Sequence, residues 1–250
     1  RAPEFEALRQ PHEPCSPPGQ SSRWSCARLL PPERCQSRPQ ELFGLTDSQA
    51  RLANRSLGAT EDFRMDDQIP GIPQISDGPG FLKMRMPERL RELLAWYELR
   101  RQDSLAPEAM DLKDILHGPS SLVSLGKFPE MQHLVVRELR DALQWWTGRP
   151  LFHTFTYGVR VYGRDAVLLH HVDRYETHLA SAVLQVQQAA EGPDEGWPLE
   201  ILTPERGCWE VYMQPGEMVL YEGARLKHGR PMRYRGKEFA NVFTHFVPHG

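Results

Sequence analysis

Three residues of the chain have the types and spacing that hold a redox-active metal: His171, Asp173 and, further along, His228. Along a β-strand, residues i and i+2 face the same side, so His171 and Asp173 can both reach one metal ion. His228 must then come from a distant strand that folds alongside. Two imidazoles and one carboxylate are the donor set of non-haem Fe(II) sites, which keep coordination positions open for a co-substrate and O₂. The alternative interpretation of His171-Val172-Asp173 is an ordinary surface turn.

The sequence around this motif favours short β-strands. β-Branched and aromatic residues alternate with polar ones, and Gly, Pro and Asp interrupt the runs at regular intervals. Such spacing predicts a sandwich or barrel. The expected elements are a hairpin over 157–169 with its turn at 163–165, strands over 179–186 and 239–246, and two strands over 210–221 that are broken at Pro215-Gly216.

Two amphipathic helices are expected before the strand-rich half. The first begins near Pro87 and carries apolar residues at helical spacing from Leu90 to Tyr97. The second begins at Pro129, and Gly148 is placed to end it. Their apolar stripes predict that both helices pack on the outside of the sheet.

The segment from about Tyr157 to Pro248, a little over a third of the chain, resembles the catalytic core of the prolyl 4-hydroxylase-like family of Fe(II)/2-oxoglutarate dioxygenases. The resemblance implies a mainly β fold with supporting helices, a double-stranded β-helix of the jelly-roll, cupin-like type. It also implies Fe(II), 2-oxoglutarate and O₂ as requirements and leaves room for ascorbate. The matching residues are Tyr162, His171-Val172-Asp173, the run from Gln214 to Tyr221, His228-Gly229 and the strand from Phe239 to Phe246.

The resemblance further implies a cation for the distal carboxylate of 2-oxoglutarate, because an unpaired buried charge is costly. Lys237 stands nine residues after His228, where the family usually has Lys or Arg. It shares strand parity with Asn241, so we expect Lys237 and Asn241 to face the same interior. Arg230 is the rival cation, since its two-pronged guanidinium suits a carboxylate better than an ammonium does. The sequence favours Lys237.

Other residues of the predicted core are weaker candidates. Tyr162 matches the tyrosine that helps hold 2-oxoglutarate in related enzymes, although an ordinary strand aromatic is the alternative. Gln185 departs from the family pattern, because some relatives carry a tyrosine there. Arg174 and His178 are the candidates for contact with substrate, and a solvated charge is the alternative for Arg174. His245 has no spacing relation to the metal motif.

Composition excludes some classes of function. The 250 residues include 30 Lys and Arg against 33 Asp and Glu, so the net charge of −3 gives no basic footprint for nucleic acid. No apolar run approaches the roughly 20 residues of a membrane-spanning helix. We expect a Pro-rich, Cys-containing segment over 1–60, a helical support region over 61–150 and the catalytic core over 151–250, with 61–250 forming one domain.

The first 40 residues resemble a linker that contributes little to the core. Cys15, Cys26 and Cys35 lie within this stretch, and in a secreted protein two of them can pair and leave one odd thiol. Cys208 stands alone in the strand-rich half. Together with the glycosylation sequon at Asn54, this pattern favours the secretory pathway or the ER lumen over the cytoplasm.

Three classes of function follow from the sequence. The first, which we favour, is hydroxylation of a prolyl residue in a protein or peptide. The second is the same chemistry on a free amino acid or another small metabolite. The third is a binding module without catalysis, against which the intact set of His171, Asp173 and His228 argues. The sequence leaves the substrate and the oligomeric state open.

Overall fold

The computed structural model describes residues 3–9, 27–30, 69–101, 106–107, 115–189, 196–203 and 207–249. The α-helices of these segments are α1 (Pro3–Leu8), α6 (Arg91–Arg100) and α7 (Pro129–Thr147). Short 3-10 helices are η2 (Ile69–Gly71), η3 (Glu88–Leu90) and η4 (Leu125–Lys127). All described strand pairings are antiparallel, and they build two sheets.

The larger sheet has the strand order β2-β11-β8-β13-β6-β5-β3 among the described residues. Its centre is long β13, which pairs along its length with both β8 and β6. The bounds are β2 (Phe81–Arg85), β11 (Glu217–Tyr221), β8 (Ala180–Ala189), β13 (Glu238–Pro248), β6 (Leu151–Gly163), β5 (Ser120–Val123) and β3 (Ala106–Pro107).

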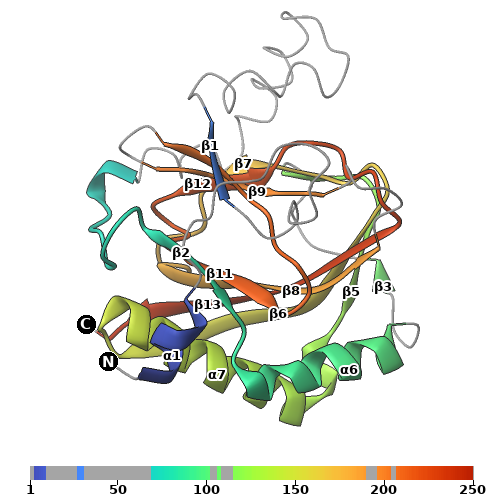
Figure 1. Ribbon diagram of the computed structural model, residues 1–250, viewed down its shortest axis with the longest axis horizontal. Helices are drawn as coiled ribbons and strands as arrows, with labels where there is room; N and C mark the ends of the chain where they lie inside the picture. Colours follow the sequence, from blue (N-terminus) through green and yellow to red (C-terminus); the bar gives the residue numbers. More distant parts are fainter. Residues whose placement is uncertain are drawn as a thin grey trace, which may run out of the picture.

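The smaller sheet has the order β1-β10-β9-β12-β7-β4 in the described part of the chain. Figure 1 shows it facing the larger sheet, with α6 and α7 along the outer side of the larger one. Two facing antiparallel sheets of this kind form a double-stranded β-helix. The bounds are β1 (Ala27–Leu30), β10 (Cys208–Val211), β9 (Leu199–Leu202), β12 (Lys227–Arg230), β7 (Val167–His171) and β4 (Leu116–His117).

The larger sheet is buried on both faces. Its outer face packs against the helices, where Val135, Leu139 and Leu143 of α7 have no exposed surface. Helix α7 begins at Pro129 and stops before Gly148, whose φ of 67° lies in the left-handed region. Both predicted helices are therefore confirmed. Within the described segments, no helix combines the length and hydropathy that crossing a membrane requires.

The inner faces of the two sheets meet in a second core of aromatic residues. Tyr162, Trp197 and Phe239 are at most 3% exposed there, and their rings contact one another edge to face. This core fills one end of the space between the sheets. The other end stays open as a cavity, which is described below.

Most of the strands predicted in the core half are confirmed, but the hairpin predicted over 157–169 is wrong, because β6 and β7 belong to different sheets and do not pair. The turn predicted between them is present, and it contains Asp165, whose φ of 67° is left-handed. Strand β9 was not predicted, and β12 was expected only as a strand without bounds that carries His228, because four residues are too few to show an alternating pattern. The division at residue 150 stays a prediction, although β2, β4 and β5 pair with strands on its far side.

The N-terminal segment contributes more to the fold than its composition predicts. Phe5 of α1 is 7% exposed and packs 5.8 Å from the ring of Trp145 on α7. Strand β1 pairs with β10, and Arg28 forms an ion pair with Glu210. The expectation of a linker is therefore wrong for residues 3–9 and 27–30, because both pieces bury side chains against the barrel.

The expectation for Cys208 is also wrong. This residue is 1% exposed and takes part in a disulfide, so it does not stand alone. The pairing predicted among Cys15, Cys26 and Cys35, and the sequon at Asn54, lie outside the described residues.

Packing of α7 on the larger sheet should account for a measurable part of the stability. Leu139→Ala removes a side chain with no exposed surface, so it should lower the free energy of unfolding by about 2–5 kcal/mol. Leu99→Ala is the control, because Leu99 on α6 is 80% exposed and should change stability by less than about 0.5 kcal/mol. Urea denaturation followed by circular dichroism measures both. Equal effects would contradict the packing described here.

Candidate metal centre

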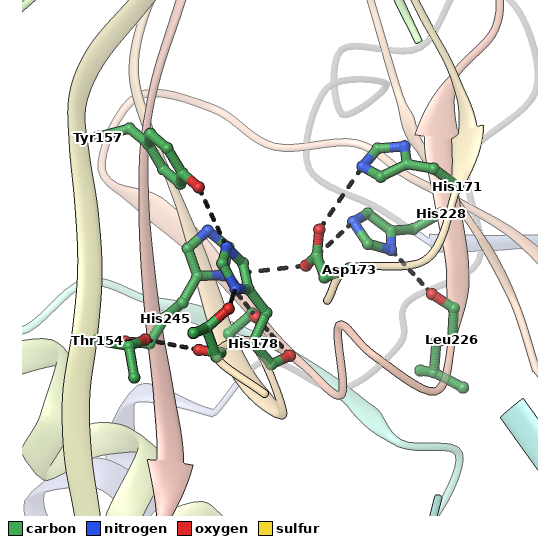
Figure 2. Close-up of polar contacts among 10 residues, drawn as sticks. Thr154, Tyr157, His171, Asp173, His178, Leu226, His228 and His245 are labelled. Carbon is green, nitrogen blue, oxygen red and sulfur yellow. Dashed lines mark hydrogen bonds and ion pairs between the residues drawn. The ribbon is translucent and has the colours of Figure 1, made fainter. Parts of the chain in front are cut away.

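Strand pairing brings the two histidines of the predicted triad together. His171 is the last residue of β7, and its antiparallel partner in β12 is His228. Asp173 follows β7 by two residues, and its two carboxylate oxygens each lie 3.7 Å from one imidazole Nε2. The ligand atoms of the three residues all lie within 4.8 Å of one another. Figure 2 shows both rings directed at the Asp173 carboxylate.

The orientation of both imidazoles is fixed by backbone carbonyls two residues earlier. Nδ1 of His171 lies 2.8 Å from the carbonyl oxygen of Leu169, and Nδ1 of His228 lies 2.8 Å from that of Leu226. A carbonyl oxygen only accepts, so each Nδ1 carries the proton and donates it. Each neutral ring therefore presents an unprotonated Nε2 to the shared point, which is the state that a metal binds.

Burial keeps the two rings neutral. It is the main cause that lowers the pKa of His171 to about 4 and the pKa of His228 to about 4. The positive charge of His228 would add to this effect at His171. At neutral pH both rings are thus neutral, with no proton on Nε2, before any metal arrives.

Asp173 is held in place by the loop between β11 and β12. Its backbone N–H donates to the carbonyl oxygen of Gly223 at 2.9 Å. A side chain on Gly223 would overlap the Asp173 carboxylate and would lie 2.6 Å from Oγ of Ser181. Burial raises the pKa of Asp173, while nearby His171 and a hydrogen bond from Ser181 act in the opposite direction. Glycine at 223 is therefore a requirement of the site.

The three side chains fit a divalent first-row metal. Two imidazole nitrogens and one carboxylate oxygen are borderline-hard donors, and three donors are fewer than such a metal takes. A metal bound by them keeps coordination positions open toward the cavity. This geometry suits a catalytic site better than a closed structural one.

The metal residues line a cavity of about 610 Å³ between the two sheets. Arg230 contributes to the wall on the side of the aromatic core. Tyr157, His178 and His245 line the other side, and Figure 2 places them across Asp173 from His171 and His228. The cavity therefore has two chemically distinct ends with the triad between them.

Arg230 is a buried cation at the first of these ends. It is 1% exposed, and burial lowers its pKa to about 10. Its Nη2 donates to Oδ1 of Asn241 at 3.1 Å, and Asn241 Nδ2 in turn donates to Oε1 of Gln185 at 2.6 Å. Nε of Arg230 has no hydrogen-bond partner among the described residues.

Lys237, the cation that the sequence favoured, is exposed and does not line the cavity. The expectation that it faces the interior is wrong. Strand parity applies only inside a strand, and β13 begins one residue later, at Glu238. Asn241, four residues on, is fully buried and faces the interior as expected.

Tyr162 is fully buried beside the same end of the cavity. Its ring packs 4.9 Å from that of Trp197, and its hydroxyl has no hydrogen-bond partner in the described part of the chain. It lies close enough to Arg230 to influence the pKa of that residue. The predicted contact between Tyr162 and 2-oxoglutarate stays a prediction.

At the second end, the rings of His178 and His245 pack against each other at an angle of 37°. Their ring centroids are 3.8 Å apart, and Nε2 of His178 lies 3.3 Å from the hydroxyl of Tyr157. Nδ1 of His245 lies 3.9 Å from Asp173 Oδ2, so the view of His245 as unrelated to the motif is wrong. Burial lowers the pKa of both imidazoles. Arg174 is exposed at the cavity mouth; the predicted substrate contacts of Arg174 and His178 stay predictions.

Sequence reasoning missed Ser181, Gly223 and His245. His245 shares strand parity with Asn241, so alternation along β13 was a usable signal for it. Ser181 and Gly223 gave no such signal, because their importance comes from contacts between elements far apart in the sequence.

No protein-family model matches the sequence, and no curated protein matches it. Among solved structures, the chain is similar to a prolyl hydroxylase from Trichoplax adhaerens, solved in complex with a peptide fragment of the hypoxia inducible factor oxygen degradation domain. The identity is 12%, the TM-score is 0.50, and the match covers 82% of this chain and 94% of the other.

Two further solved structures are similar. A Pseudomonas putida prolyl-4-hydroxylase is 17% identical with a TM-score of 0.46, over 78% of this chain and all of the other. HygX from Streptomyces hygroscopicus, solved with nickel, 2-oxoglutarate and hygromycin B, is 14% identical with a TM-score of 0.49, over 69% of this chain and 84% of the other.

The likeness to the Trichoplax adhaerens structure shows the fold of this chain. The predicted double-stranded β-helix, mainly β with supporting helices, is confirmed by that likeness together with the two facing sheets. The His-Asp-His group of this chain therefore lies in a fold similar to that of the Trichoplax adhaerens prolyl hydroxylase.

The site makes Gly223 a sensitive position. Gly223→Ala places a methyl group against the Asp173 carboxylate and Ser181, so the carboxylate must move and metal affinity should fall roughly ten- to a hundredfold. Gly71→Ala is the control, since no atom lies within 4 Å of the added group. Competition titration with a fluorescent metal chelator gives both affinities. Unchanged binding in Gly223→Ala would contradict the proposed support of Asp173.

Proposed function

We propose that this protein is an Fe(II)- and 2-oxoglutarate-dependent dioxygenase that hydroxylates a carbon atom of its substrate. One observation carries the proposal: His171, Asp173 and His228 converge beside a cavity whose wall also holds the buried cation Arg230. A metal and a dicarboxylate need such a pair of sites a short distance apart. A binding module without catalysis has no need of all three metal ligands.

The end of the cavity at Arg230 fits the distal carboxylate of 2-oxoglutarate. A buried guanidinium is costly unless an anion pairs with it, and its planar fork matches a carboxylate. Arg230 Nε and the Tyr162 hydroxyl are buried donors without hydrogen-bond partners among the described residues, and a carboxylate supplies acceptors for such donors. We therefore assign the anchoring role to Arg230 rather than Lys237.

The protein residues then have separate tasks. His171, Asp173 and His228 hold the metal, while the carbonyls of Leu169 and Leu226 keep the imidazoles in the right tautomer. Iron with 2-oxoglutarate and O₂ supplies the oxidation, with succinate and CO₂ as by-products. Asn241 holds the Arg230 guanidinium in position through its carbonyl oxygen. The two sheets limit the access of water to the reacting atoms.

For the substrate, we propose a prolyl residue of a protein or peptide. The cavity mouth supports this choice, because Phe155 is 48% exposed and its ring stacks 5.9 Å from that of Tyr157. Aromatic faces of this kind suit a small apolar ring on an extended chain. Free amino acids and small metabolites are the second candidate, since the metal-binding residues line a cavity between the sheets rather than an open surface.

The reaction is tested with the full chain and a mixed substrate panel. The chain is incubated with Fe(II), 2-oxoglutarate, O₂ and either Pro-rich peptides or free amino acids, and mass spectrometry detects the addition of one oxygen atom. Oxygen addition to a peptidyl proline is the expected result. Oxygen addition only to free amino acids would contradict the peptide assignment, and no succinate under any condition would contradict the proposed chemistry.

Loss of one metal ligand should abolish the reaction. His228→Ala removes one of three donors, so bound iron and succinate production should both fall to background while the circular dichroism spectrum is retained. His133→Ala is the control, because His133 is exposed on α7, away from the cavity. Iron analysis after gel filtration and a succinate assay provide the readouts. Succinate production by His228→Ala at the parent rate would rule out this metal site.

Two cations can be compared directly as anchors for 2-oxoglutarate. Arg230→Met should raise the dissociation constant for 2-oxoglutarate at least about tenfold, because it leaves a carboxylate in a buried site without its cation. Lys237→Met should change it less than about twofold, because Lys237 is exposed. Calorimetric titration of the Zn(II)-loaded chain measures both constants without turnover. The reverse order of effects would return the role to Lys237.

A further inference from the structure

A second buried guanidinium, that of Arg160, lines the same cavity. Arg160 lies on β6 directly opposite Asn241 of β13, and it is 6% exposed. Its Cζ atom is 5.1 Å from the ring centroid of Phe243 and 5.9 Å from that of Tyr157. Both rings belong to the cavity wall, so the guanidinium is positioned by two aromatic faces that the cavity itself exposes.

Arg160 and Arg230 act on different ends of the cavity. The guanidinium of Arg160 lies over the ring of Tyr157, whose hydroxyl is 3.3 Å from Nε2 of His178 at the end opposite the aromatic core. The neighbours that influence the pKa of Arg230 are instead Tyr162 and Tyr221. If 2-oxoglutarate is anchored at Arg230, Arg160 is left on the side from which a substrate reaches the metal.

The charges on the described cavity wall favour an anion on that side. Its buried charged side chains are the two guanidiniums of Arg160 and Arg230, and the partly buried carboxylate of Asp173 is directed at the metal position. Glu176, the other acidic residue of the wall, is exposed at the mouth. An arginine held by aromatic rings at a cavity wall recognises a carboxylate through two parallel hydrogen bonds.

We propose that Arg160 binds a carboxylate group of the substrate, and that the prolyl residue proposed above is therefore one with a free carboxylate, either the C-terminal residue of a peptide or an N-acylated proline. This inference rests on the proposed function, because it takes the Arg230 end as the place of 2-oxoglutarate. It makes Arg160 a specificity-determining residue: an acid fits the cavity, and the matching neutral amide leaves a buried guanidinium without that acceptor.

The test compares acids with their amides on the full chain loaded with Zn(II) and 2-oxoglutarate, which cannot turn over. The probes are N-acetyl-L-proline with N-acetyl-L-prolinamide, and benzoate with benzamide, so that the result does not depend on one scaffold. Ligand-observed NMR gives the dissociation constants. At least about tenfold tighter binding of each acid is expected, and Arg160→Met should remove the difference.

Two further variants keep the test decisive. Arg160→Lys retains the charge but loses the fork, so it should bind the acids more weakly than the parent and more tightly than Arg160→Met. This variant carries the test if Arg160→Met does not fold. Arg164→Met is the matched control, because Arg164 is exposed in the turn that follows β6 and does not line the cavity; it should retain the preference for acids.

Several other results of these titrations would overturn the inference about Arg160. Equal binding of acids and amides, no measurable binding of any acid, or a preference that survives in Arg160→Met would overturn the inference. A loss of 2-oxoglutarate affinity in Arg160→Met as large as that in Arg230→Met would assign Arg160 to the co-substrate and also overturn it. If the chain binds neither Zn(II) nor 2-oxoglutarate, the proposed function fails, and the probe titrations on the metal-free chain still decide whether Arg160 binds a carboxylate.

Discussion

The site depends on the register between β7 and β12. Antiparallel pairing sets His228 directly opposite His171, and a register shift follows before Arg230 reaches its own partner, Leu168. A slip of one residue would turn one imidazole out of the cavity and Arg230 away from its interior end, because side chains alternate across a strand. One pairing thus positions two metal ligands and also the cation proposed to bind 2-oxoglutarate.

Burial also sets the protonation state of the three metal-binding side chains. It keeps His171 and His228 neutral at Nε2, whereas it disfavours the charged form of Asp173 until a cation arrives. The backbone offsets part of this cost through the carbonyls of Leu169 and Leu226, and the loop at Gly223 holds the carboxylate. The metal-binding side chains are therefore in position before the metal binds. This arrangement costs free energy, because one carboxylate and two guanidiniums are held within a mostly apolar fold.

The sequence predicted the structure correctly where the signal comes from residues close together in the chain. Alternation predicted that His171 and Asp173 face one point, and the apolar stripe over α7 predicted the helix that covers the larger sheet. It failed where the answer depends on where a strand starts or on contacts between distant elements. Lys237 has the expected spacing from His228, yet β13 starts at Glu238 and leaves Lys237 exposed. Arg230 is buried because of its place in β12, a strand whose bounds the sequence did not predict. The prediction for the N-terminal segment was wrong because β1 is recognisable as a strand only from its pairing with β10.

The most direct test of this account is a crystal structure of the full chain with Mn(II) and 2-oxoglutarate under anaerobic conditions. We expect one metal ion in contact with Nε2 of His171, Nε2 of His228 and a carboxylate oxygen of Asp173, and the distal carboxylate of 2-oxoglutarate on the Arg230 guanidinium. A metal ion bound elsewhere would contradict the central claim about the triad. If the distal carboxylate of 2-oxoglutarate lies on Lys237 instead, Arg230 is not the residue that anchors 2-oxoglutarate.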